Sequence, residues 1–360
     1  MGGEKQDDLA RGRRTIKVLI VDDSTVAREL LVHILGADPE IEVLTAVPDG
    51  AVALEAVQRY KPDVITMDIN MPKMNGFDAT RRVMETQPTP IVIVTASWDS
   101  GEVATTFRAI EAGALIVVPR PPGPGHPDHE AQASELLQLV KLMSEVKVVR
   151  RWARVQRAAS VSTVLPVQVR QSRANIGLVV IGASTGGPLA LQTLVAGLPT
   201  RFPAPVVIVQ HMATGFVEGF VQWLASACNR QVCIAEHGER LRPGIVYVGL
   251  DGYEMTVSVH ESIALAPCQG RNALCPSISA LFRSAAEIFG PRAVGVLLSG
   301  MGKDGALELK VMKERGAITF AQDLESSIVH GMPGEAIRLG GASYILPPAE
   351  IAAALAALVE

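Results

Sequence analysis

The sequence has few aromatic residues, few cysteines and no long apolar run. Phe, Trp and Tyr make up 4% of its 360 residues, so a core must be built from aliphatic side chains, which are plentiful because 48% of residues are hydrophobic. No apolar stretch approaches the roughly 18 to 20 residues that a membrane-spanning helix needs. The charged N-terminal stretch also lacks the apolar region of a secretory signal. We therefore expect a soluble, cytoplasmic protein without direct membrane insertion.

The sequence also lacks a strong excess of charge of either sign. Its net charge of −4 gives no electrostatic basis for binding nucleic acid or an anionic membrane. The cysteines form no C-x-x-C pair and have no nearby histidine at a spacing typical of zinc sites. We expect all four to be reduced thiols, as in most cytosolic proteins. They are Cys228, Cys233, Cys268 and Cys275.

The first part of the chain alternates short apolar runs with amphipathic segments, after a charged tail at 1–14 that we expect to be disordered. This alternation predicts a doubly wound α/β domain with a parallel sheet, which we place at residues 15–146. The predicted strands lie near 16–21, 42–46, 63–67, 91–94 and 115–118, and the predicted helices near 24–36, 50–59, 76–86, 101–110 and 132–145.

Acidic and polar residues follow the ends of these predicted strands. They are Asp22 and Asp23 after the first strand, Asp68 after the third, Thr95 after the fourth and Arg120 after the fifth. Because the carboxyl ends of parallel strands share one edge, the three carboxylates converge, and such a cluster favours a bound cation such as Mg²⁺. Asp22 and Asp23 alone are equally consistent with capping of the next helix.

With the run DINMPKMNG at 68–76, this domain resembles a response-regulator receiver domain. The resemblance implies a flavodoxin-like fold, Mg²⁺ held by Asp22, Asp23 and Asp68, and phosphorylation of Asp68 by a histidine kinase. It also implies that Thr95 responds to the phosphoryl group, which adds about −1.5 to −2 of charge.

Two positions depart from the receiver pattern. Arg120-Pro121 stands where that family has a lysine before the proline, and Val117 stands at a position that is commonly aromatic. Arginine keeps the positive charge, but its planar guanidinium is not an equivalent phosphate ligand. We therefore expect Asp68 to accept the phosphoryl group while the switch involving Arg120 is altered.

Residues 147–175 are rich in arginine, serine, glutamine and valine and show little periodicity. Such a basic segment is typical either of nucleic-acid binding or of a solvated linker. With a net charge of −4 over the whole chain, we favour a linker between two domains.

Residues 176–360 contain a second set of strands and helices, which predicts another mostly parallel, Rossmann-like sheet. Polar pairs at 251–252 and 260–261 predict turns, so we expect an antiparallel hairpin that is added to the parallel sheet. The predicted strands are 177–182, 206–210, 245–248, 254–259, 262–266, 294–298 and 317–321, and the predicted helices are 188–197, 215–227, 277–289, 304–315, 333–339 and 348–358.

The run VVIGASTGGP at 179–188 is typical of a strand, a glycine turn that carries Ser184, and the start of a helix. The spacing Gly182-x-Ser184-x-Gly186 fits a nucleophile elbow, in which the turn exposes the hydroxyl. Glycine-rich turns between a strand and a helix bind phosphate more often than they perform acyl chemistry. The turn alone therefore leaves both interpretations open.

Two further residues follow strands of the same predicted sheet. His211 comes directly after one strand, and Asp304 follows another through the run SGMGK at 299–303. A nucleophile, a base and an orienting carboxylate at one sheet edge are what acyl transfer requires, and the loop at 300–302 can offer backbone N–H groups to an oxyanion. Alternatively, His211 is structural and Asp304 caps the helix that follows it.

Three other histidines are rival bases. His237 and His260 lie in polar turns with no nucleophile nearby in sequence, whereas His330 precedes a Gly-Met-Pro-Gly loop that can also border the active edge.

The chain order Ser–His–Asp differs from the Ser–acid–His order of α/β-hydrolases. Residues 176–358 instead resemble the catalytic domain of chemotaxis protein-glutamate methylesterases, through IGASTGG at 181–187, QHM at 210–212 and SGMGKDGA at 299–306. The resemblance implies a catalytic triad of Ser184, His211 and Asp304. It also implies that Thr185 and Met301 are accessory residues around the oxyanion.

The two resemblances together imply a response regulator whose output is an esterase. The implied reaction is hydrolysis of γ-glutamyl methyl esters on methyl-accepting chemoreceptors, with release of methanol, deamidation of receptor glutamines at the same site, and no cofactor for the esterase. The receiver would hold the esterase inactive until Asp68 is phosphorylated. Two alternatives stay open: a module that binds a nucleotide phosphate at 182–187, and a receiver-controlled hydrolase that acts on another substrate.

Overall fold

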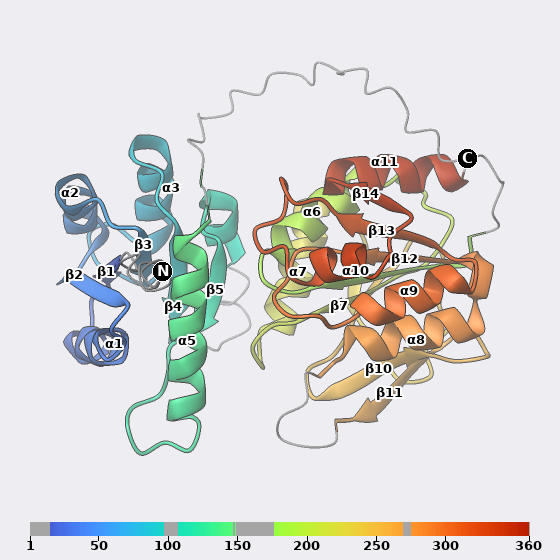
Figure 1. Ribbon diagram of the computed structural model, residues 1–360, viewed down its shortest axis with the longest axis horizontal. Coiled ribbons are helices and arrows are strands. Elements are labelled where there is room, and N and C mark those ends of the chain that lie inside the picture. Colours follow the sequence, from blue (N-terminus) through green and yellow to red (C-terminus); the bar gives the residue numbers. More distant parts are fainter. Residues whose placement is uncertain (1–14, 97–106, 147, 149–175, 269–274, 360) are drawn as a thin grey trace, which may run out of the picture. The chain divides into compact units, whose positions relative to one another are not determined.

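The computed structural model describes residues 15–96, 107–146, 148, 176–268 and 275–359 (Figure 1). The predicted tail at 1–14 and nearly all of the predicted linker at 147–175 lie outside these ranges. The chain divides into two compact units, one around a five-stranded sheet and one around a seven-stranded sheet. Within the described ranges, no helix is long and apolar enough to cross a membrane.

The first unit is a sheet of five parallel strands in the order β2-β1-β3-β4-β5. This is the flavodoxin-like order, which binds ligands where the chain reverses between β1 and β3, and it confirms the predicted fold class. The strands are β1 (Ile16–Val21), β2 (Ile41–Val47), β3 (Val64–Met67), β4 (Ile91–Thr95) and β5 (Ile116–Pro119), and the helices include α1 (Thr25–Gly36), α2 (Gly50–Tyr60), α3 (Gly76–Thr86) and α5 (His129–Ser144).

Three helices of this unit begin where the sequence offers a capping side chain. Ser24, Asp49 and Asn75 precede α1, α2 and α3, and each side chain accepts a hydrogen bond from a backbone N–H of the first turn. β3 and β4 are buried along their whole length, as expected for parallel strands covered on both faces. The capped helix starts and the buried parallel strands together place Asp22 and Asp68 at one edge of the sheet.

The second unit is built on seven parallel strands in the order β14-β13-β12-β6-β7-β9-β8. The chain runs outward from β6 to β7 and later returns to the other side of β6 as β12, which makes the carboxyl end of β6 a topological switch point. The strands are β6 (Leu178–Ala183), β7 (Val206–Gln210), β8 (Val232–Ile234), β9 (Val246–Val248), β12 (Ala293–Leu297), β13 (Ile318–Gln322) and β14 (Tyr344–Leu346). The helices are α6 (Gly187–Gly197), α7 (Val217–Cys228), α8 (Ile278–Ile288), α9 (Ala306–Glu314), α10 (Met332–Arg338) and α11 (Pro348–Val359).

The predicted antiparallel hairpin is present as β10 (Tyr253–Val257) and β11 (Ile263–Pro267). The expectation that it extends the parallel sheet is wrong, because the hairpin is a separate two-stranded sheet. Its apolar side chains Met255, Val257 and Ile263 belong instead to a buried cluster that includes residues of α8. The edge strands β8 and β14 are not predicted, since runs of three residues carry too little periodicity.

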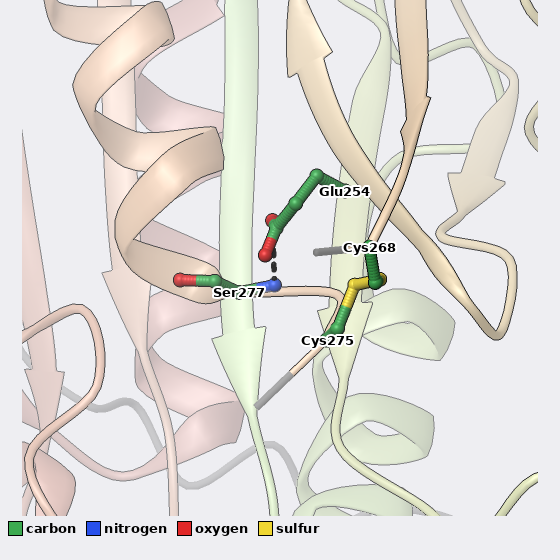
Figure 2. Close-up of a disulfide and its surroundings, with 4 residues drawn as sticks. All are labelled: Glu254, Cys268, Cys275 and Ser277. Carbon is green, nitrogen blue, oxygen red and sulfur yellow. Dashed lines mark hydrogen bonds between the residues drawn. A yellow bond between two sulfur atoms is a disulfide. The ribbon is translucent and has the colours of Figure 1, made fainter. Parts of the chain in front are cut away.

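The expectation of four reduced thiols is wrong for one pair. Cys268, directly after β11, is joined by a disulfide to Cys275, which lies two residues before the N-cap of α8 (Figure 2). A spacing of seven positions escapes a search for C-x-x-C, but the fold brings the two Cα atoms to 6.3 Å, a separation that a disulfide can bridge. Cys228 and Cys233 are free thiols, and burial raises the pKa of each to about 11.

Gly76→Ala tests the packing that shapes the edge of the first sheet. Gly76 begins α3, and a Cβ there would lie 2.1 Å from the backbone carbonyl oxygen of Asp68. Because a backbone atom cannot swing aside as a flexible side chain does, we expect the variant to lose about 1 to 3 kcal/mol of stability. Calorimetry of the intact chain measures this loss as a lower unfolding temperature.

The matched control is Gly36→Ala at the end of α1, where a Cβ meets nothing within 4 Å and alanine is the better helix former. Equal unfolding temperatures for the two variants would contradict this account of Gly76.

Candidate functional site

Ser184 and His211 leave the second sheet side by side. Ser184 follows β6 and His211 follows β7, and these parallel strands pair with Ala183 opposite Gln210. The N–H of His211 donates to the carbonyl of Ala183 at 2.9 Å. The structure thus brings the two residues to one edge of the sheet.

Gln210 is a residue of this site that sequence reasoning misses. Its buried side-chain Nε2 donates to the carbonyl oxygens of Ser184, at 2.9 Å, and His211, at 2.7 Å. One amide group therefore ties the two loops together. The signal that could have found it is a polar side chain that ends an apolar strand directly before His211.

Asp304 reaches the same edge from the loop after β12. Its Oδ2 lies 3.0 Å from Nε2 of His211, and the side chains of His211 and Asp304 are 11% and 10% exposed. The Nε2 atom is not aligned well enough for this contact to be a hydrogen bond, and catalytic contacts in unliganded enzymes are often misaligned in this way. The two side chains are therefore in close contact, they form an ion pair when His211 is protonated, and alignment on substrate binding can tighten the contact.

The start of α8 holds Asp304 in place. Its carboxylate accepts from the N–H of Ile278 at 2.7 Å, from the N–H of Ser279 at 3.0 Å and from the hydroxyl of Ser277 at 3.2 Å. Burial by itself raises the pKa of Asp304, but the contact with His211 and the donated hydrogen bonds outweigh burial and hold the pKa well below its usual range. Asp304 is therefore ionised at neutral pH.

The alternative that Asp304 caps the helix following it is wrong, because the N-cap of α9 is Gly305. Asp304 accepts from the start of α8 instead. Sequence reasoning misses Ser277 and Ser279 as its partners, since these contacts span 27 and 25 positions. A serine directly before a predicted helix signals an N-cap, but it does not say which carboxylate the helix will hold.

The loop at 299–302 lies directly against Ser184. The N–H of Ser184 donates to the carbonyl of Ser299 at 3.0 Å, and a Cβ on Gly300 would lie 2.7 Å from the Cβ of Ser184. The close approach requires glycine at this position. Contrary to the expectation for this loop, the N–H of Gly300 is not available to an oxyanion, because it donates to the carbonyl of Val329 at 3.0 Å.

The two accessory candidates flank these residues. Thr185 follows Ser184 and is 8% exposed, and its carbonyl accepts from the hydroxyl of Ser299 at 2.7 Å. Met301 follows Gly300 and is 46% exposed. Thr185 and Met301 therefore lie in the two loops that meet at Ser184.

The rival histidines are placed differently. His237 contacts the backbone of β11, and His260 lies in an exposed turn of the hairpin. His330 does border the site, since it forms an isolated bridge with Gly300. However, its Nδ1 lies 3.2 Å from the hydroxyl of Ser327, and burial lowers the pKa of His330. The hydroxyl that the ring of His330 contacts is therefore that of Ser327.

The three carboxylates of the first unit form one cluster. One oxygen each of Asp22, Asp23 and Asp68 lies within 4.8 Å of the others. Burial and the neighbouring charge of Asp22 raise the pKa of Asp68 to about 6, and burial raises the pKa of Asp22 as well. Like charges held this closely are unfavourable until a cation or a proton neutralises them.

Capping does not account for Asp22. Its Oδ1 accepts from the N–H of Ser24 at 2.9 Å, but it is the hydroxyl of Ser24 that caps α1. Its buried Oδ2 has no hydrogen-bond partner among the described residues, although the guanidinium of Arg120 lies 3.5 Å from it. An orphaned carboxylate oxygen beside two more carboxylates is the donor chemistry that Mg²⁺ prefers, so these residues fit that ion.

Thr95 and Arg120 lie at the same edge as the cluster. Thr95 ends β4 opposite Pro119 of β5, and the N–H of Arg120 donates to the carbonyl of Thr95 at 2.8 Å. Val117 is half-buried on the same strand. A charge change at the cluster therefore acts directly beside a buried hydroxyl and a guanidinium.

The fold and the two sites define a class: a receiver unit with an acidic pocket, combined with a hydrolase unit that carries a serine, a histidine and an aspartate at one sheet edge. Residues 179–355 match the CheB methylesterase family, and residues 18–126 match the response regulator receiver domain. The predicted two-domain α/β architecture agrees with both.

Individual proteins extend this similarity over nearly the whole chain. A protein-glutamate methylesterase/protein-glutamine glutaminase of Nitrosospira multiformis is 56% identical over 96% of this chain and 97% of its own length, and one of Geobacter metallireducens is 55% identical over 95% and 99%. The crystal structure of the Thermotoga maritima CheB catalytic domain covers 51% of this chain and 98% of its own, at 35% identity and a TM-score of 0.48. The chain belongs to the protein-glutamate methylesterase/protein-glutamine glutaminase family. The predicted family and enzyme class are confirmed.

Asp68→Asn tests how the acidic cluster affects stability. The pKa of Asp68 is about 6 in the folded protein and 3.8 ordinarily, so the folded state binds this proton more tightly. Ionisation of Asp68 therefore does not affect the free energy of unfolding below about pH 4. It lowers this free energy as the pH rises from about 4 through 6, by on the order of 3 kcal/mol in the absence of a cation. We expect Asp68→Asn to unfold at a higher temperature than the parent at about pH 8 in chelator, and not at about pH 4.

The matched control is Asp78→Asn, which removes an exposed carboxylate of the same unit. Equal stability of the Asp68→Asn variant and the parent at alkaline pH in chelator would show that the cluster carries no such penalty.

Proposed function

We propose that the protein hydrolyses glutamyl methyl esters on the cytoplasmic helices of methyl-accepting chemoreceptors, with release of methanol, under control of phosphorylation at Asp68. The observation that carries this proposal is the placement of Ser184, His211 and Asp304 at one sheet edge. It is supported by relatives named protein-glutamate methylesterase that are 56% and 55% identical along nearly the whole chain. The place of action is the cytoplasm, where those receptor helices lie.

Ser184 is the nucleophile of the proposed reaction. Its hydroxyl oxygen attacks the ester carbonyl while His211 accepts the proton. The tetrahedral intermediate then loses its methoxy group, which His211 protonates, so that methanol leaves and a glutamyl ester of Ser184 remains. Water that gives a proton to His211 hydrolyses this ester, and the returned proton restores the hydroxyl.

Asp304 orients the base and stabilises it when charged. Its contact with Nε2 of His211 leaves Nδ1 of the ring for Ser184. Because donors at the start of α8 keep Asp304 ionised, it favours the imidazolium that forms in both steps. We assign the oxyanion donors to the loops that contain Thr185 and Met301, where one such donor is worth about 3 kcal/mol of barrier.

Deamidation of receptor glutamines follows the same course. Attack by Ser184 on a side-chain amide gives the same acyl-enzyme once His211 has protonated the departing ammonia. The name of the relatives includes protein-glutamine glutaminase, which supports both substrates for one site.

In the first unit, Asp68 accepts a phosphoryl group from a histidine kinase. Mg²⁺, held by Asp22, Asp23 and Asp68, would neutralise the negative charge that gathers in the pocket. Thr95 and Arg120 respond to the added phosphoryl oxygens by hydrogen bonding and ion pairing. The domain boundaries that we propose are 15–146 and 176–360, joined by a linker at 147–175.

A nucleotide-binding module at 182–187 is the weaker alternative. The N–H of Gly187 donates to the carbonyl of Ser184 at 2.7 Å, so this amide of the turn is not offered to a phosphate. The nearby pair of His211 and Asp304 has no role in that alternative.

Ser184→Ala is expected to lower the kcat for methanol release from methylated chemoreceptor by at least about 10⁴-fold. The parent protein should release methanol faster when a small phosphodonor is added, and Ser184→Ala should not respond. The control is Ser327→Ala, which removes the hydroxyl beside His330 and should keep near-parental turnover.

The reverse pattern, with activity kept in Ser184→Ala and lost in Ser327→Ala, would move the active site to the rival pair. Absence of methanol release from all three proteins would reject the chemoreceptor ester as the substrate.

A further inference from the structure

The disulfide between Cys268 and Cys275 joins the β10–β11 hairpin to the start of α8 (Figure 2). Cys268 belongs to the hairpin, since its N–H donates to the carbonyl of Gly252, in the turn before β10, at 3.0 Å. Cys275 lies two residues before Ser277, the N-cap of α8. The covalent bond therefore limits how far the start of α8 can move from the hairpin.

Glu254 makes a second link between the same two parts. It lies on β10 opposite Ala266 of β11, and its Oε2 accepts from the N–H of Ser277 at 3.0 Å (Figure 2). Further along, the N–H of Val257 donates to the hydroxyl of Ser284 on α8 at 3.1 Å. The hairpin thus positions α8 by one covalent bond and two hydrogen bonds.

The start of α8 is also the part of the helix that holds Asp304, through three hydrogen bonds. Asp304 in turn lies 3.0 Å from Nε2 of His211. A shift of Ser277 therefore shifts the carboxylate relative to the imidazole. Misplacement of a catalytic group by about 1 Å can cost about 100-fold in rate, so small movements here have a measurable effect.

We propose that Cys268 and Cys275 form a redox-responsive modification site that controls how firmly Asp304 is positioned. This inference rests on the proposed function, because it concerns the regulation of the same active site. The oxidant is a low-molecular-weight disulfide: one cysteine thiolate attacks it and releases one thiol, and the second cysteine displaces the other. Two cysteine thiols thereby lose two electrons and two protons, and the small disulfide becomes two thiols.

Accessibility and compartment agree with this role. Both cysteines are partly exposed, so a small disulfide or thiol can reach them. Disulfides in cytosolic proteins are usually transient and serve catalysis or redox sensing. By contrast, the free thiols of Cys228 and Cys233, with pKa values raised to about 11, are protonated and poor nucleophiles.

The test compares the intact protein with two double variants, C268S/C275S and C228S/C233S, each after oxidised glutathione or after a reductant. Mass spectrometry after alkylation records whether the bond has formed. On reduction, we expect kcat for methanol release by the parent and by C228S/C233S to fall about threefold or more, with little change in KM. C268S/C275S should show the lower kcat under both conditions.

A second measurement does not depend on turnover. The imidazole of His211 is titrated by NMR in the oxidised and reduced protein, with its signal identified by its absence in His211→Gln. Two acidic side chains share hydrogen-bonding partners with Asp304. Glu254 on β10 accepts from the N–H of Ser277, and Glu308 on α9 accepts from the hydroxyl of Ser279. Because a less firmly held Asp304 supports the imidazolium less, the ring signals of His211 should differ between the oxidised and the reduced protein.

The outcomes separate the two claims. A His211 titration and a kcat that are the same in both redox states, with the bond shown to have opened, would overturn the redox site and leave the esterase standing. Failure of oxidised glutathione to form the bond would also overturn it. A redox-dependent His211 titration without methanol release would support the redox site and reject the proposed substrate.

Discussion

The second unit depends on one mostly buried carboxylate, that of Asp304, which interacts with three separate parts of the chain. The loop after β12 carries it, the start of α8 donates three hydrogen bonds to it, and His211 at the end of β7 lies 3.0 Å away. Burial of a charge is costly unless hydrogen bonds and an opposite charge compensate it. The same interactions that let the carboxylate stay ionised also hold it beside His211, the base that we propose.

Both units place acidic residues near the carboxyl edge of a parallel sheet. Their surroundings shift the pKa values of these residues in opposite directions. Asp304 is fully supplied with donors, and its pKa lies below the usual range. Asp22 retains a buried oxygen without a hydrogen-bond partner among the described residues, and the pKa of Asp68 is raised to about 6. The first arrangement keeps the carboxylate ionised, as the role that we propose for Asp304 requires. The second holds several negative charges that Arg120 offsets only in part, which suits a pocket that receives a cation and a phosphoryl group.

The parts of the account that the sequence predicts are those that follow from strand ends. Ser184, His211 and Asp68 each come directly after a buried, mostly apolar strand, and parallel strands end at a common edge. The parts that it misses depend on contacts between distant segments. The bonds from Ser277 and Ser279 to Asp304 span 27 and 25 positions, the disulfide has a spacing of seven, and the hairpin packs beside α8 instead of extending the sheet. The local sequence pattern indicates a capping serine or a turn. Tertiary packing determines which distant residue or element that serine or turn contacts.

The central claim is that Ser184 and His211 act as one nucleophile–base unit at this edge. The most direct measurement is kcat for ester hydrolysis by Ser184→Ala, His211→Ala and the variant with both changes. Residues that act as a unit are not additive, so each single change should cost about as much as the two together, on the order of 10⁴-fold or more. The account would be contradicted if the fold-decreases in kcat of the two single variants multiplied in the double variant. It would also be contradicted if His211→Ala kept most of its activity.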